Sequence, residues 1–227
     1  VLEHVHAGLA TAVAGPLVQT LRAWRGAGET AVFAALPRPG HLAGMPRAAL
    51  DVLAAASAAG ECVIAPSVGG LLVPTCSAFG TDGDRGVLAQ WAAYDGLALP
   101  RHVSEATDLG ELSRRLAEAM QEATSTLRSV GGLPWRGDEA HPQPTRGHQT
   151  PMPRGIAPKA LNLMQRSDRI RALALDGLSM EADGPALDAT TSAARAAALR
   201  GVVTAADAAL AGATNVAVMA LAGWRPA

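Results

Sequence analysis

Three short apolar runs, residues 62–65, 71–78 and 87–94, follow one another with only a few residues between them. The gaps consist mainly of turn-forming Pro, Gly, Ser and Asp residues. Two parallel strands need a crossover of a dozen or more residues, usually a helix. Because these gaps are too short for such a crossover, the spacing predicts three consecutive antiparallel strands joined as hairpins.

The rest of the first half supplies one more strand and two helices. Residues 2–24 place Leu and Val at helical spacing, which predicts a helix with an interruption or kink at residues 15–16. Residues 30–36 form a short apolar run that ends at a proline and predicts a strand. Residues 47–59 predict a short helix with Gly60 as its C-cap. The four strands together predict one mostly antiparallel sheet.

A long helix is predicted after the sheet. Ser104 or Asp108 is a suitable N-cap, and Leu and Met recur at helical spacing up to residue 130. Arg and Glu occupy the opposite face of this helix, the side expected to face solvent.

The remainder of the chain divides into a polar segment and a helical segment. Residues 131–158 are rich in Pro, Gly and polar residues, and we expect an exposed and mobile loop or linker there. Helices are then predicted over residues 159–175 and 186–222, with a break in the second near Gly201 or Gly212.

Length and composition favour a single α+β body with a helical annex. The chain has 227 residues, of which 49% are hydrophobic and only 17% charged. We therefore expect an α+β core over residues 1–130, a loop or linker over residues 131–158, and a helical segment over residues 159–227 packed on the core. In this α+β fold the small antiparallel sheet lies in the N-terminal half, with flanking helices.

The net charge, the most apolar segment and the cysteines bear on the expected location and partners of the protein. A net charge of −1 provides no global field toward nucleic acid or an anionic membrane. Residues 202–222 are long and apolar enough to suggest a membrane span, but Asp207 and Asn215 favour a buried soluble helix. Cys62 and Cys76 lack metal-ligand spacing and predict buried reduced thiols, with a cross-strand disulfide as the alternative. We expect a cytoplasmic protein with neither a membrane nor a nucleic-acid partner.

Several segments resemble a family of uncharacterised actinobacterial proteins. They are the Pro and Gly loop at residues 36–46, residues 61–74, the Pro-Arg-Gly motif at 153–155 with the Pro-Lys-Ala-Leu motif at 158–161, and the final helix around residues 195–215. The resemblance covers most of the chain. It implies a shared fold pattern but no activity, because the family has none assigned.

No known catalytic or cofactor motif is present. The sequence has no P-loop, no G-x-S-x-G, no H-E-x-x-H and no C-x-x-C, and no two histidines have the spacing that directs both to one metal from a helix. Asp82 and Asp84 resemble part of a calcium loop but lack its remaining ligands, so a hairpin turn is the better interpretation. We expect no cofactor and no metal, and the sequence leaves open whether the protein is an enzyme.

Two groups of residues carry the functional hypotheses. The last helix is rich in Ala and Gly, which allow close helix contacts, and we expect an assembly protein whose interface includes Gly212, Met219 and Trp224, with a homodimer as the partner arrangement. The alternative is a binder of a small anionic ligand at Arg38, His41 and Asp84. Arginines also outnumber acidic residues over residues 136–171, where a solvated surface is the simpler interpretation.

Overall fold

The computed structural model describes residues 4–7, 17–42, 44–80, 86–99, 105–130, 152–183 and 188–225. The chain divides into two compact units, one made of Val1–Asp108 with Ala211–Pro226 and the other of Leu109–Leu210. The second unit thus begins at residue 109, and the chain returns to the first unit at residue 211. The first is the sheet unit and the second is the helical unit.

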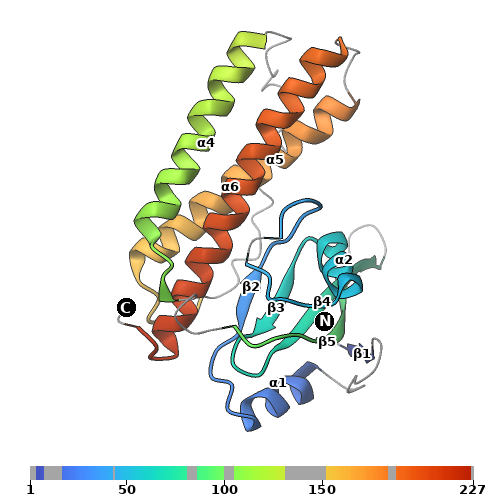
Figure 1. Ribbon diagram of the computed structural model, residues 1–227, viewed down its shortest axis with the longest axis vertical. Coiled ribbons are helices and arrows are strands. Elements are labelled where there is room, and N and C mark those ends of the chain that lie inside the picture. The colour runs from blue at the N-terminus through green and yellow to red at the C-terminus, as the bar shows by residue number, and fades with distance from the viewer. Residues whose placement is uncertain are drawn as a thin grey trace. The chain divides into compact units, whose positions relative to one another are not determined.

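A five-stranded sheet organises the sheet unit (Figure 1). The strands β2 (Phe33–Ala35), β3 (Cys62–Ala65), β4 (Gly70–Phe79) and β5 (Gly86–Asp95) pair antiparallel in chain order. This confirms the mostly antiparallel sheet and the hairpins predicted from the short gaps.

The beginning of the chain departs from the prediction of a helix over residues 2–24. Strand β1 (His4–Ala7) pairs in parallel with Gln90–Ala93 of β5, and helix α1 (Leu17–Gly26) begins only at residue 17. The two histidines of β1 alternate with Val5 and Ala7, a period of two that suits a strand once a partner strand is in place. The predicted interruption at residues 15–16 lies outside the described residues.

The core of the sheet unit lies beneath β3 and β4. Ile64, Leu71 and Leu72 are almost completely buried, and helix α2 (Leu50–Ala59) adds the buried Val52. Gly60 has φ +75° and donates its N–H to a carbonyl in the last turn of α2, which confirms the predicted glycine C-cap.

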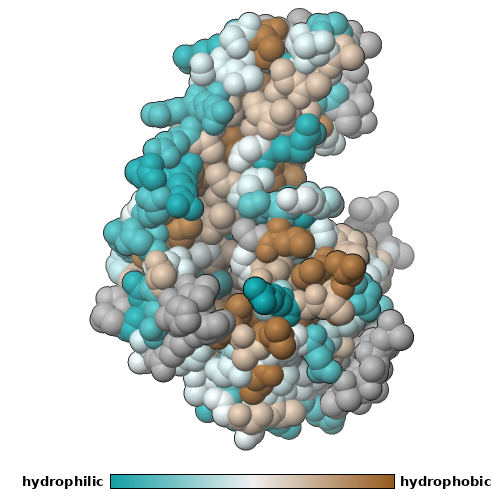
Figure 2. Space-filling view, in the orientation of Figure 1, coloured by the Kyte–Doolittle hydropathy of each residue, from teal (hydrophilic) through white to brown (hydrophobic). Residues whose placement is uncertain are grey.

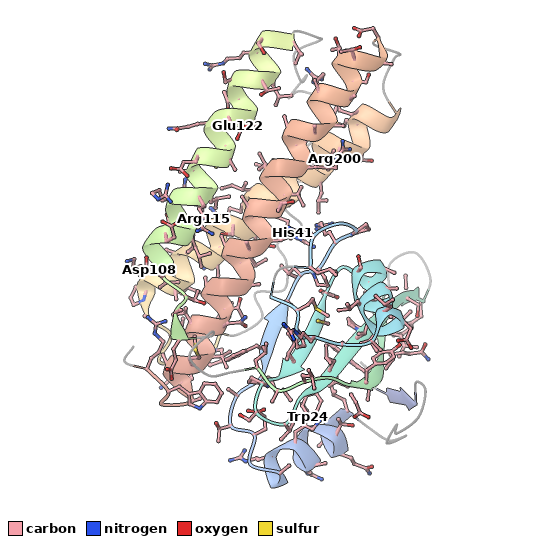
Figure 3. All side chains as sticks on the ribbon, in the orientation of Figure 1. Trp24, His41, Asp108, Arg115, Glu122 and Arg200 are labelled. Atoms are coloured by element: carbon pink, nitrogen blue, oxygen red, sulfur yellow. The ribbon has the colours of Figure 1, made fainter. Side chains whose placement is uncertain are left out.

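Close packing of α1 on the sheet depends on a glycine. A Cβ at Gly70 of β4 would lie 2.6 Å from the Cζ2 atom of Trp24, so the indole of Trp24 rests against the bare backbone of the strand (Figure 3).

The helical unit contains α4 (Leu109–Val130), α5 (Pro158–Asp183) and the first part of α6 (Ala189–Leu221) (Figure 1). Its buried cluster takes residues from all three helices: Ala123, Ala174, Val202 and Val203. Helix α4 confirms the predicted helix and begins immediately after Asp108.

Two details of the later helices were predicted wrongly. Helix α5 runs to Asp183, beyond the predicted end near residue 175. Its start at Pro158 is within one residue of the prediction, and proline is accepted there because its missing N–H has no intrahelical partner in the first turn. Helix α6 is continuous through Gly201 and Gly212. A helical glycine costs only about 1 kcal/mol relative to alanine, and the surrounding packing outweighs that cost.

Candidate functional site

The hairpin of β4 and β5 extends well beyond the rest of the sheet. All ten residues of β4 pair with β5, from Gly70 opposite Asp95 to Phe79 opposite Gly86, whereas β3 pairs only with Gly70–Leu72. Residues 75–79 of β4 with residues 86–90 of β5 therefore project beyond β3, and we call this hairpin segment the arm; at its base Gln90 also pairs with His4 of β1. The edge of β4 that faces away from β5 has no strand partner from residue 73 onward among the described residues.

The arm is exposed, partly apolar and uncharged. Residues 75–79 of β4 are all exposed, and the side chains of Phe79 and Val87 have relative accessibilities of 54% and 56%. Phe79 lies over Gly86, where a Cβ would come within 2.5 Å of its ring, an arrangement that shields a glycine in a strand. Soluble proteins usually protect such an edge with charges, a bulge or a covering element.

The direction of the backbone groups on this edge follows from a hydrogen bond elsewhere in the sheet. In an antiparallel sheet the N–H and C=O of one residue point to the same side, and the side alternates along the strand. Ala34 of β2 donates its N–H to Asn215 Oδ1 at 2.8 Å and accepts a hydrogen bond from Asn215 Nδ2 at 2.9 Å. Both groups of Ala34 therefore point away from β3.

The strand register carries this direction across to β4. Val63 lies opposite Ala34 and must point toward β4, where it faces Leu72, so Leu72 points toward β3. By alternation, Pro74, Cys76 and Ala78 point to the same side as Leu72, which is the unpaired edge. Proline agrees with this assignment, because a residue without an N–H is accepted in a strand only where that position faces no partner.

The outer edge of β2, on the same side of the sheet as the free stretch of β4, is covered. Besides the two Asn215 bonds to β2, the indole of Trp224 packs edge-on against Phe33, with ring centroids 5.6 Å apart, and its Nε1–H donates to Thr30 Oγ1 at 2.9 Å. The end of α6 and the residues after it thus close the β2 edge, and the free β4 edge is a distinct feature of the sheet unit.

This arrangement bears on the interface proposed from the sequence. Met219, which was expected at the interface, is fully buried, and Trp224 is in contact with Phe33 and Thr30. Gly212 is partly buried within α6. Buried alanines of α6, such as Ala206 and Ala213, use the small-residue face in packing within the chain.

Arg38 and His41, predicted as anion ligands, face each other across a tight turn in the loop after β2 (Figure 3). Each donates its backbone N–H to the other's carbonyl at 2.8 Å, and Gly40 between them has φ +79°. The third predicted ligand, Asp84, lies outside the described residues, so the structure does not test whether the three come together.

A buried carboxylate that was missed in the sequence has a structural role. Glu29 has a relative accessibility of 4%. Its Oε2 accepts the backbone N–H of Ser67 at 2.7 Å and that of Val68 at 3.4 Å, and its Oε1 accepts the hydroxyl of Ser67 at 3.1 Å. Thr30 and Ala31 donate further backbone bonds to Oε1. The carboxylate therefore holds the turn between β3 and β4, and no sequence motif marks it.

The two cysteines lie in different environments, and both are free thiols. Cys62 is buried, and burial raises the pKa of its thiol to about 12; the thiol also lies 3.2 Å from the Met45 sulfur. Cys76 is exposed on the arm, which corrects the prediction that both thiols are buried.

An open groove of about 700 Å³ lies between α4 and α5 of the helical unit. Arg128 and Arg166 line it together with polar side chains that include Gln121 and Ser125. Neither arginine has an acidic partner among the described residues. The surface of α4 that Figure 2 shows is largely hydrophilic. On this helix Arg114 and Arg115 pair with Glu111, and their hydrogen bonds lower the pKa of Glu111 to about 2.

Helix α6 is the one described helix whose length and composition would suit a membrane span. Half of its most apolar window is buried inside the structure. Asp207 within that window has a relative accessibility of 2% and its Oδ1 accepts a 2.7 Å bond from Arg171 Nε on α5. Among the described residues, no group of three or more His, Cys, Asp or Glu side chains is arranged to hold a metal ion.

The fold and the free edge define an α+β protein with a sheet surface suited to strand pairing. Two family models match the chain, the N-terminal domain of Rv1486c-like proteins over residues 2–106 and the C-terminal domain over residues 110–211. The chain therefore belongs to the Rv1486c-like family, which is uncharacterised. This agrees with the resemblance to uncharacterised actinobacterial proteins noted in the sequence. The boundary between the two matches falls where the two compact units divide. Neither a curated protein nor a solved structure matches the chain.

Proposed function

We propose that this protein is an assembly protein that forms a homodimer through the free edge of β4. The observation that carries the proposal is the exposed stretch of β4 at residues 75–79, where backbone N–H and C=O groups face outward without a strand partner among the described residues. Such an edge is a template for another strand.

The composition of the arm supports a second copy of the chain as the partner. The twenty residues of β4 and β5 contain one charged side chain, Asp95, at the end of β5 farthest from the arm. Two copies that pair along residues 75–79 therefore bring no like charges together within these strands. An edge that pairs with itself also forms a closed two-fold dimer, the commonest arrangement among soluble oligomers.

The test is the mass of the chain in solution over a wide concentration range, measured by light scattering and sedimentation velocity. We expect a monomer–dimer equilibrium for the natural chain and a shift toward monomer for Thr75→Lys, which places a charge on the arm. Gln19→Lys adds the same charge on the exposed surface of α1 and should dimerise normally. A monomeric mass at every concentration refutes the proposal.

A second function, binding of a small polyanion, is favoured by the α4–α5 groove. Arg128 and Arg166 line one groove from two helices, and guanidinium groups bind phosphate oxygens with paired hydrogen bonds. This proposal moves the predicted anion site from the Arg38 and His41 turn to the helical unit.

Calorimetric titration with inorganic pyrophosphate tests this second function. We expect binding that weakens with added salt and is lost when Arg128 and Arg166 are both changed to Gln. Arg200→Gln removes an exposed arginine from α6 and serves as the control. Equal affinity in all three proteins excludes the groove as an anion site.

A further inference from the structure

We infer that the two β4 strands pair antiparallel about a two-fold axis beside Ser77, with Cys76 of each copy opposite Ala78 of the other. This inference rests on the proposed self-association and specifies its geometry. The partner is a second copy of this chain, and the paired segment is the exposed end of β4.

The outward direction of Cys76 and Ala78 limits the registers that the pair can adopt. Hydrogen-bonded positions require an outward-pointing residue on each strand, and on this edge those residues are Pro74, Cys76 and Ala78. An outward-pointing residue must therefore lie opposite another one. A two-fold axis beside a residue places that residue opposite its own copy, and the axes near the middle of the exposed edge are those beside Cys76, Ser77 or Ala78.

Only the axis beside Ser77 uses the edge fully. An axis beside Cys76 places Pro74 opposite Ala78 and loses the hydrogen bonds that a proline cannot donate. An axis beside Ala78 places Cys76 opposite Gly80, whose φ of +97° takes it out of the extended conformation. With the axis beside Ser77, each Cys76–Ala78 pair exchanges two backbone hydrogen bonds, and the pairing ends at Pro74.

The side chains accept this register without a clash of charge. Ser77 meets its own copy, and Thr75 lies opposite Phe79, so a hydroxyl group and an exposed aromatic ring face each other across the interface. The two Cys76 thiols lie diagonal to each other, because each is opposite Ala78. The geometry therefore needs no disulfide between the natural cysteines.

A cysteine at position 77 reports this axis directly. The two Ser77 residues occupy a non-hydrogen-bonded position, where Cα atoms of paired strands lie about 4.5 Å apart, within the range that a disulfide spans. In a Cys76→Ser background, Ser77→Cys should form a covalent dimer under mild oxidation, detected on a non-reducing gel. Thr75→Cys in the same background is the matched control and should form much less, because Thr75 faces Phe79.

Removal of one N–H tests the hydrogen bonds. Ala78→Pro deletes the outward N–H of residue 78 and leaves the bonds between β4 and β5 intact. Because each of the two copies loses one backbone hydrogen bond, the dimer should weaken about 10- to 100-fold. Ala78→Val keeps the N–H and should dimerise like the natural chain. Circular dichroism checks that each variant retains its fold.

The outcomes separate the geometry from the function. A dimer that forms no disulfide at position 77 and tolerates Ala78→Pro overturns this register while self-association stands. A monomer at all concentrations overturns both. Efficient crosslinking at position 77 together with weakening by Ala78→Pro supports the pairing described here.

Discussion

Asn215 provides the sharpest test of how the β2 edge is closed. Its side-chain amide makes two hydrogen bonds to the backbone of Ala34, at 2.8 and 2.9 Å, across 181 positions of sequence. Asn215→Ala removes both bonds and leaves an N–H and a C=O of the edge strand without their partner. The direction derived for the β4 edge depends on the same contact.

The expected loss follows from the two bonds and the helix position. Two neutral hydrogen bonds contribute about 2 kcal/mol in total. Alanine is favoured over asparagine inside a helix by roughly 0.6 kcal/mol, which offsets part of that loss. We therefore expect Asn215→Ala to lower the free energy of unfolding by about 1.5 kcal/mol, measured by urea denaturation followed by tryptophan fluorescence and circular dichroism.

Asn162→Ala is the matched control, because Asn162 is exposed on α5 and its side chain makes no hydrogen bond to the described residues. It gains the same helix propensity and should be neutral or slightly stabilised. If Asn215→Ala is as stable as Asn162→Ala, the side chain does not hold β2 and the reasoning about this edge is wrong.

Three further predictions concern single side chains. Arg171→Ala should cost about 3 to 5 kcal/mol in urea denaturation because it leaves the Asp207 carboxylate buried without its guanidinium, and Asp207→Leu added to it should restore part of the loss. Because hydrogen bonds from neighbouring arginines lower the pKa of Glu111 from 4.5 to about 2, its contribution to stability is complete above pH 4.5 and disappears as the pH falls toward 2; a carboxyl NMR titration with a midpoint near 4.5 contradicts this. Iodoacetamide should modify Cys76 and spare Cys62 in the folded protein at neutral pH, and mass spectrometry showing rapid modification of both is the contrary result.

The candidate site was only partly accessible from the sequence. The apolar runs that became β4 and β5 were visible, together with the turn between them. The free edge was not, because it depends on where β3 ends, and that is decided by the pairing of Gly70–Leu72. The exposure of Cys76 has the same origin, because β4 is longer than its neighbour β3 and its residues beyond the end of β3 are left uncovered.

The interface expected at the end of the chain shows the same limit. Composition correctly marked α6 as a close-packing helix, but it could not show that this packing lies within the chain. Met219 appears at the end of an apolar helix in the sequence, whereas in the fold it is fully buried. Trp224 packs against Phe33, a residue nearly two hundred positions earlier in the sequence.

The sequence by itself determined the elements whose cause is local. Short gaps required antiparallel hairpins, helical spacing produced α4, and a glycine ended α2 at Gly60. The tertiary structure decided β1, whose parallel partner β5 lies more than eighty residues away, and the closure of β2 by Asn215. Propensity and periodicity act over a few residues, whereas strand partners and covered edges are selected by contacts between distant segments, which form only when the whole unit folds.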